Sequence, residues 1–347
     1  MKPAKEDDEF VIRAMTAEDA VGVAELVHSC YGDGYPHDEI YDPAKFFAGQ
    51  ERGDHISTVA ATPDGTIAGH WAFVFHTPII AESAMTMTRL EYRGHGIAAH
   101  LSADLYAKLL ERGVKWIMGE PVLIHTATQE FALEIGDGMG AITGMRLKCL
   151  HHAEAAGFTE VFEHGRVSLA MAFGPIATMR VHELWIAPEY EELLGIVLEA
   201  TEWPRLVRSD PPTTVDLPET TVLTFEFDLS HLAAKIEIKT IGADLLAAVR
   251  VERDRARSQG ALFIELRLPL GQPQSAKDGL LDLGFSFAAL MPEMYPDCDL
   301  LVLQWLDDPH VERSTWQLLN SHIEKLADAI VAQAQVAFER PGSHEAL

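Results

Sequence analysis

A short glycine-rich run, residues 89–98, has the residue types of an anion-binding turn. Its centre reads Arg93-Gly94-His95-Gly96-Ile97-Ala98. A strand-like segment, 80–88, precedes it, and apolar residues recur at helical spacing over 97–110. Two glycines permit a backbone in which successive N–H groups converge, and a helix start adds unpaired donors and the positive end of its dipole. The order of strand, turn and helix therefore predicts a site for an anion such as a pyrophosphate.

The loop 31–41 is a second candidate, this time for a small organic ligand. It combines tyrosines, a histidine and acids with glycines and a proline. Adaptable backbone with polar and aromatic side chains suits small-ligand recognition. Tyr35, His37 and Tyr41 are the substrate candidates, and a surface loop packed by its own tyrosines is the alternative interpretation.

At Arg93–Ala98 the sequence resembles the GNAT superfamily of N-acetyltransferases, whose signature is Gln/Arg-x-x-Gly-x-Gly/Ala. The resemblance covers about 165 residues and implies that an acyl-CoA, with acetyl-CoA as the acyl donor, binds here without a metal. The residues that it assigns to the coenzyme form two groups. The first lies on the strand end, the turn and the helix start: Met87, Thr88, Arg89, Arg93, Gly94, His95, Gly96, Ile97 and Ala98. The second lies further along the chain, where the superfamily often has an asparagine: His125 and Gln129.

The resemblance also implies direct attack by an amine on the thioester. Glu82, at the start of the strand 80–88, matches by position the general base of several such enzymes, and partial burial could raise its pKa toward working pH. Glu120, at the end of the next strand, is a second candidate carboxylate. The tyrosine that commonly acts as general acid is missing, so Tyr41, His125 and water remain open as the proton donor.

The composition limits the partners. The chain has 347 residues and a formal charge of −26, from 53 acidic and 27 basic side chains. Such a field repels nucleic acid and anionic membranes, so neither is an expected partner. Three widely separated cysteines match no disulfide or metal framework, and the first ten residues lack the apolar core of a signal peptide. A cytoplasmic protein is expected, with homo-oligomerisation left open.

The element pattern predicts an α/β (α+β) protein with two tandem acetyltransferase-like domains. Each is expected to be a mixed, mostly antiparallel twisted sheet flanked by helices. The expected boundaries are 1–178 for the catalytic domain, 179–215 for a helical connection and linker, and 216–347 for a second domain. The second domain repeats the order of helix, glycine, strand, short helix and glycine, but no Arg-x-x-Gly-x-Gly/Ala precedes its first helix. It is therefore interpreted as a degenerate copy that has lost coenzyme binding.

The sequence also predicts the local structure of one strand and two helices. Strict alternation along 80–88 places Glu82, Ala84, Thr86 and Thr88 on one face and Met85 and Met87 on the other. A helix is expected over 274–283. A closing helix is expected to be capped by Asp308, with Pro309 in its first turn.

Two functions of different class fit these observations. The first is an N-acetyltransferase that acts on a small amine, with a cationic acceptor favoured by the acidic surface. The second is a non-catalytic acyl-CoA-binding or regulatory protein whose second domain docks a partner.

Overall fold

The computed structural model describes residues 10–33, 35, 37–151, 166–210, 216–295 and 298–343. They group into two compact units, and along the chain the first unit ends at Gly119 and the second begins at Glu120. The domain boundaries expected from the sequence stay a prediction. The division between the two compact units, at Gly119 and Glu120, does not coincide with any of them. The predicted linker lies partly outside the described residues. In the described part of the chain, no helix is long and apolar enough to cross a membrane.

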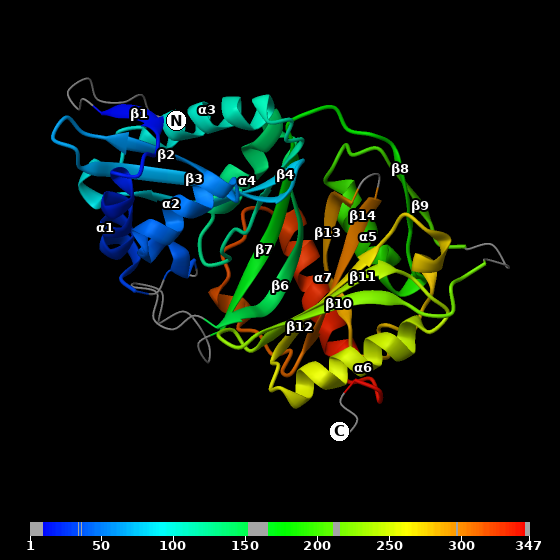
Figure 1. Ribbon diagram of the computed structural model, residues 1–347. Coiled ribbons are helices and arrows are strands. Elements are labelled where there is room, and N and C mark those ends of the chain that lie inside the picture. Colours follow the sequence, from blue (N-terminus) through cyan, green and yellow to red (C-terminus); the bar gives the residue numbers. More distant parts are fainter. Residues whose placement is uncertain are drawn as a thin grey trace. The chain divides into compact units, whose positions relative to one another are not determined.

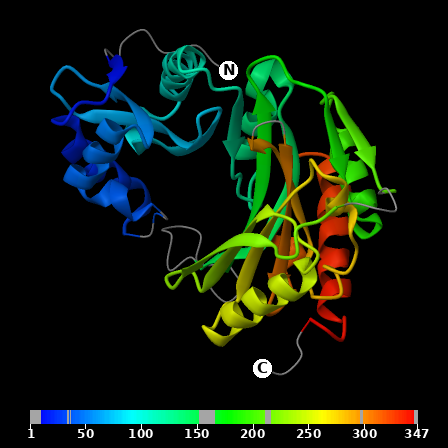
Figure 2. The same ribbon diagram turned by 45° about the vertical axis from the view of Figure 1, so that its right-hand side comes forward.

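The first unit is a mixed sheet with helices on both faces (Figure 1). Its strand order is β1-β2-β3-β4-β5, in which β4 and β5 are parallel and the other neighbours are antiparallel. In both views the sheet lies between α3 on one side and α1 with α2 on the other (Figures 1 and 2). The elements in chain order are β1 (Val11–Ala14), α1 (Asp19–Tyr31), η1 (Asp38–Tyr41), α2 (Pro43–Arg52), β2 (His55–Ala61), β3 (Ile67–Thr77), β4 (Ile80–Thr88), η2 (Leu90–Tyr92), α3 (Ile97–Glu111) and β5 (Trp116–Gly119).

Two glycines show why this part of the chain folds as it does. Gly65 closes the β2–β3 hairpin at φ 89°, in the left-handed region that glycine adopts at little cost. Gly69 on β3 faces the start of α3, and a Cβ atom there would lie 2.5 Å from Cγ2 of Ile97. Only a residue without a side chain lets α3 approach β3 this closely, and the turn before α3 is positioned by that contact.

The second unit contains a larger sheet with the strand order β7-β6-β13-β14-β12-β11-β10. Its pairs are antiparallel except for β11 and β12. Figure 2 shows α7, in red, alongside β13 and β14, in orange. The elements in chain order are α4 (Ala127–Gly138), β6 (Ala141–His151), β7 (Arg166–Pro175), β8 (His182–Trp185), α5 (Pro188–Glu199), β9 (Arg205–Arg208), β10 (Val222–Asp228), β11 (Ala233–Thr240), α6 (Leu245–Ser258), β12 (Phe263–Pro269), η4 (Pro273–Ala276), β13 (Ser286–Tyr295), β14 (Cys298–Leu306), η5 (Arg313–Thr315) and α7 (Ser321–Phe338).

The fold class expected from the sequence is confirmed, since both units are mixed, mostly antiparallel sheets with flanking helices. The strict alternation along β4 is wrong. Met85 has φ 54°, and the register with β3 shifts between His70 and Ala72. This β-bulge buries both Ala84 and Met85, which strict alternation would place on opposite faces.

The helix expected over 274–283 is also wrong, because only the short turn η4 forms there. The N–H groups of Gly279 and Leu281 donate to the carboxylate of Glu189, at 3.3 and 3.1 Å. Gly279 also has φ 106°, which no helix contains. A side chain that lies far away in the sequence therefore replaces the helical acceptors of this segment.

The closing helix begins later than expected. The Asn320 side chain caps α7 by accepting from the N–H groups of His322 and Ile323, each at 3.0 Å. Asp308 instead accepts from Lys148 Nζ and His310 N–H. The sequence interpretation did not identify α2, β13 or the parallel pair β8–β9.

Candidate active site

The predicted anion turn connects β4 to α3 in the first unit. Gly94 and Gly96 have φ values of 85° and 76°, and Gly96 is the N-cap of α3. Among the described residues, the structure shows no acceptor for the N–H groups of Gly94, Gly96, Ile97 and Ala98. A Cβ atom at Gly94 would meet nothing within 4 Å. Four backbone donors at a helix N-terminus can therefore receive an anion.

The residues at the strand end hold this turn in place. Arg89 Nε donates to the carbonyl of Ile67 at 2.8 Å, and Arg93 Nε donates to the carbonyl of Thr88 at 3.3 Å. Met87 is buried opposite His70 of β3. Both guanidinium groups are therefore anchored beside the turn, where they supply positive charge to an otherwise acidic chain.

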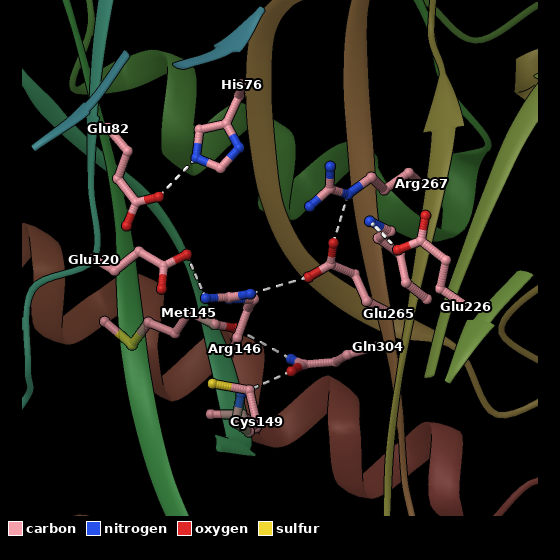
Figure 3. A network of polar contacts seen from close by, with 12 residues as sticks. His76, Glu82, Glu120, Met145, Arg146, Cys149, Glu226, Glu265, Arg267 and Gln304 are labelled. Carbon is pink, nitrogen blue, oxygen red and sulfur yellow. Dashed lines mark hydrogen bonds and ion pairs between the residues drawn. The ribbon is translucent and has the colours of Figure 1, made fainter. Parts of the chain in front are cut away.

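Glu82 is paired with His76, a residue that the sequence interpretation missed. The distance between Glu82 Oε2 and His76 Nε2 is 2.6 Å, and the two side chains are 13% and 30% exposed (Figure 3). The two residues lie on neighbouring strands, β4 and β3, where the register shifts between Phe75 and Thr77. No pattern in the sequence indicates the irregular register that turns His76 toward Glu82. The pair is a carboxylate with an adjoining proton carrier, at an accessible position.

Tyr35 connects the loop 31–41 to β4. The hydroxyl of Tyr35 accepts a hydrogen bond from the N–H of Met85 at 2.9 Å. The hydroxyl of Tyr41 donates to the carbonyl of Gly32 at 2.8 Å and accepts from the N–H of Tyr35 at 2.9 Å. His37 Nδ1 lies 3.3 Å from a carboxylate oxygen of Glu39. Tyr41 therefore uses its proton within the loop, whereas Tyr35 reaches the strand that carries Glu82.

The remaining candidates belong to the second unit. Gln129 is fully buried, and its Nε2 donates to the carbonyls of Val122, His125 and Gln317. Its Oε1 accepts from the N–H of Leu319. A contact between Gln129 and a coenzyme would require these bonds to break, and coenzyme contacts by His125 and Gln129 stay predictions.

Glu120 belongs to a chain of ion pairs within the second unit (Figure 3). It pairs with Arg146, which lies 3.2 Å from Glu265, and Glu265 in turn lies 2.5 Å from Arg267. Burial alone would raise the pKa of Glu265, but Arg267 and Arg146 outweigh it and hold the pKa at about 2. The chain therefore consists of charged groups that neutralise one another, and the catalytic role of Glu120 stays a prediction.

The residues that the structure describes contain no group of three or more His, Cys, Asp or Glu side chains placed to hold a metal ion. Cys30, Cys149 and Cys298 are free thiols. The described site thus consists of a backbone anion turn, the Glu82–His76 pair and the tyrosine loop, all within the first unit.

Neither a family model nor a curated protein sequence matches the chain. Solved structures of acetyltransferases are similar to about half of it. A GNAT-family acetyltransferase from Staphylococcus aureus is 12% identical, with a TM-score of 0.36, over 49% of this chain and 100% of that one. A GNAT-family N-acetyltransferase from Escherichia coli, solved with CoA, is 17% identical, with a TM-score of 0.32, over 51% and 86%. A spermidine/spermine N-acetyltransferase from Vibrio cholerae is 13% identical, with a TM-score of 0.36, over 48% and 93%.

Proposed function

We propose that the protein is an acetyl-CoA-dependent N-acetyltransferase that transfers an acyl group to a small cationic amine. The observation that carries the proposal is the turn between β4 and α3, in which four N–H groups have no acceptor among the described residues. Arg89 and Arg93 flank it. A diphosphate fits such donors, and the strand that leads into the turn carries the Glu82–His76 pair.

The proposed reaction needs no covalent enzyme intermediate. The ammonium group of the acceptor first releases a proton to solvent. The neutral nitrogen then attacks the thioester carbonyl carbon, the new C–N bond forms, and the C–S bond breaks. Glu82 accepts the proton that leaves the nitrogen, directly or through one water, and His76 can pass that proton on. The thiolate that leaves takes a proton from solvent. The acidic surface, with a net charge of −26, draws a cationic acceptor toward the site.

A turnover assay tests this function. Purified full-length protein with acetyl-CoA is offered polyamines, amino sugars and amino acid derivatives, and the acetylated product is identified by mass spectrometry. We expect turnover with a cationic amine and none with its phosphorylated counterpart. Micromolar binding of acetyl-CoA without acetylation of any amine from about pH 6 to 9 would establish the binding or regulatory function instead. An absence of binding heat would refute both functions.

Substitution of Glu82 tests the base. Glu82→Gln should lower kcat at pH 7 by about 100- to 1000-fold, because general-base catalysis contributes factors of this size. The dissociation constant for acetyl-CoA, measured by calorimetry, should stay within about twofold. Glu237→Gln is the matched control, since Glu237 is also a half-buried strand carboxylate but pairs with Lys239 and Tyr295 in the second unit. Full turnover by Glu82→Gln would remove Glu82 from this role.

A further inference from the structure

Met85, at the bulge of β4, has both backbone groups held by side chains. Its N–H donates to the hydroxyl of Tyr35 at 2.9 Å, and its carbonyl accepts from Nδ1 of His70 at 2.9 Å. Because a carbonyl can only accept, Nδ1 of His70 carries the proton and the ring has a defined tautomer. His70 is fully buried and lies edge-on to Phe46. The peptide of Met85 is thus clamped from two sides.

The hydroxyl of Tyr35 still has a proton to donate. Its oxygen is the acceptor for Met85, and the part of the chain that the structure describes offers no acceptor for its own proton. Tyr41, by contrast, donates to Gly32. Burial raises the pKa of Tyr35, and the charge of Glu82 raises it further, so the hydroxyl stays protonated at neutral pH. Tyr35 is therefore a permanent hydrogen-bond donor oriented by the strand that carries Glu82.

We propose that the hydroxyl of Tyr35 donates a hydrogen bond to the thioester carbonyl oxygen and to the oxyanion that forms when the amine adds, and that His70 is a positioning residue. This inference rests on the proposed N-acetyltransferase function. As the C–N bond forms, the carbonyl π pair moves to oxygen, and it returns when the C–S bond breaks. Tyr35 keeps its proton throughout. A fixed donor aimed at developing charge accelerates such a step because it needs no reorganisation.

The decisive variant is Tyr35→Phe in the full-length protein. We expect kcat to fall about 100-fold, a typical loss for one oxyanion donor. Calorimetry should show acetyl-CoA affinity within about twofold of the wild type. The melting temperature should fall by a few degrees, because the N–H of Met85 loses its acceptor. Tyr106→Phe is the control, because Tyr106 is also a partly buried tyrosine of the first unit, but it lies on α3 with its ring edge-on to Phe73. Its kcat should stay within about twofold.

His70 gives an independent readout. Asparagine can present an amide N–H in place of Nδ1–H, so His70→Asn should keep most of kcat, whereas His70→Leu should lower it at least about tenfold. Equal kcat for Tyr35→Phe and the wild type would overturn the inference and leave the proposed function intact. A loss of kcat accompanied by an equal loss of acetyl-CoA affinity would also overturn it, since Tyr35 would then be structural. No turnover by the wild type would refute the proposed function and this inference together.

Discussion

The two units each contain a parallel strand–helix–strand crossover, yet we propose an anion site in the first of them alone. In the first unit α3 connects the parallel strands β4 and β5, and in the second α6 connects the parallel strands β11 and β12. Both helices pack beside their own strands. The difference lies in the turn that leads into each helix.

In the turn before α6, the chain itself provides acceptors for the N–H groups of both residues that precede Asp244. The N–H of Gly242 donates to Oγ1 of Thr221 at 3.0 Å, and the N–H of Ala243 donates to the carbonyl of Pro218 at 2.9 Å. Asp244 accepts from the N–H of Thr221 at 2.6 Å. A Cβ atom at Gly242 would lie 2.3 Å from the carbonyl carbon of Thr220. The chain itself fills the space that an anion would need.

The comparison shows that the crossover topology does not by itself fix the hydrogen bonding of the turn that leads into its helix. The turn before α3 has two glycines at positive φ and donors with no acceptor among the described residues, while the turn before α6 has internal acceptors. This supports the interpretation of the second region as a copy without coenzyme binding, which stays a prediction.

The largest expected effect comes from blocking the open turn. Gly94→Asp should weaken acetyl-CoA binding about 1000-fold, or about 4 kcal/mol, because a carboxylate then occupies the anion position. The matched control is Gly113→Asp, at the other end of α3. Gly113 has φ 79°, close to the 85° of Gly94, and a Cβ atom would meet nothing within 4 Å at either position. Calorimetry with acetyl-CoA measures both variants. Equal weakening by the two would show that charge or strain, not the turn, controls binding.

A smaller effect concerns acid stability, because the two units bury different ionisable groups. Burial lowers the pKa of His70 to about 4, below its unfolded value of about 6.5. Between these pH values the unfolded chain takes up a proton that folded His70 does not. The stability of the first unit should therefore fall as pH falls from 6.5 to 4, by roughly 3 kcal/mol. Glu265, with its pKa at about 2, contributes stability that is fully present above about pH 4.5 and is lost progressively as pH falls from 4.5 through about 2.

Hydrogen exchange with mass spectrometry, corrected for the intrinsic rate at each pH, can follow β3 and β12 separately. We expect β3 to lose protection at higher pH than β12. His70→Asn should reduce the change between pH 6.5 and 4 in β3 and leave β12 as it was. Part of the change should remain, because burial also lowers the pKa of His55 on the neighbouring strand β2. Loss of protection by both strands at one pH, or an unchanged β3 profile in His70→Asn, would contradict this assignment.

The smallest expected effect concerns the turn before α6 in the second unit. Asp244→Ala removes the acceptor of the Thr221 N–H, which should cost about 1 kcal/mol and lower the melting temperature by a few degrees. It should create no coenzyme site, because Thr221 and Pro218 still hold the donors of Gly242 and Ala243. The test is calorimetry with acetyl-CoA on Gly94→Asp/Asp244→Ala. Binding heat in this double variant would show that Asp244 alone closes the second turn.

Local sequence patterns were sufficient to predict the strand, the turn and the helix that form the candidate anion site. The strand, the glycine turn and the helix over residues 80–110 are confirmed in order, because glycine conformation and helical periodicity act within a few residues. The β2–β3 hairpin and the antiparallel pair β10–β11 likewise join strands that are neighbours in the sequence. The mostly antiparallel mixed sheets followed from the order of these elements.

Hydrogen-bond and ion-pair partners that are distant in the sequence could be identified only from the tertiary structure. The sequence by itself determined the open backbone donors of the turn, since Gly94 and Gly96 need no distant residue to adopt their conformations. Only the fold decided that His76 meets Glu82, that Tyr35 and His70 hold Met85, and that Glu189 replaces a helix at residues 279–281. Each of these is a hydrogen bond or ion pair between a side chain of one element and a backbone or carboxylate group of another. Local periodicity in the sequence does not predict such a contact.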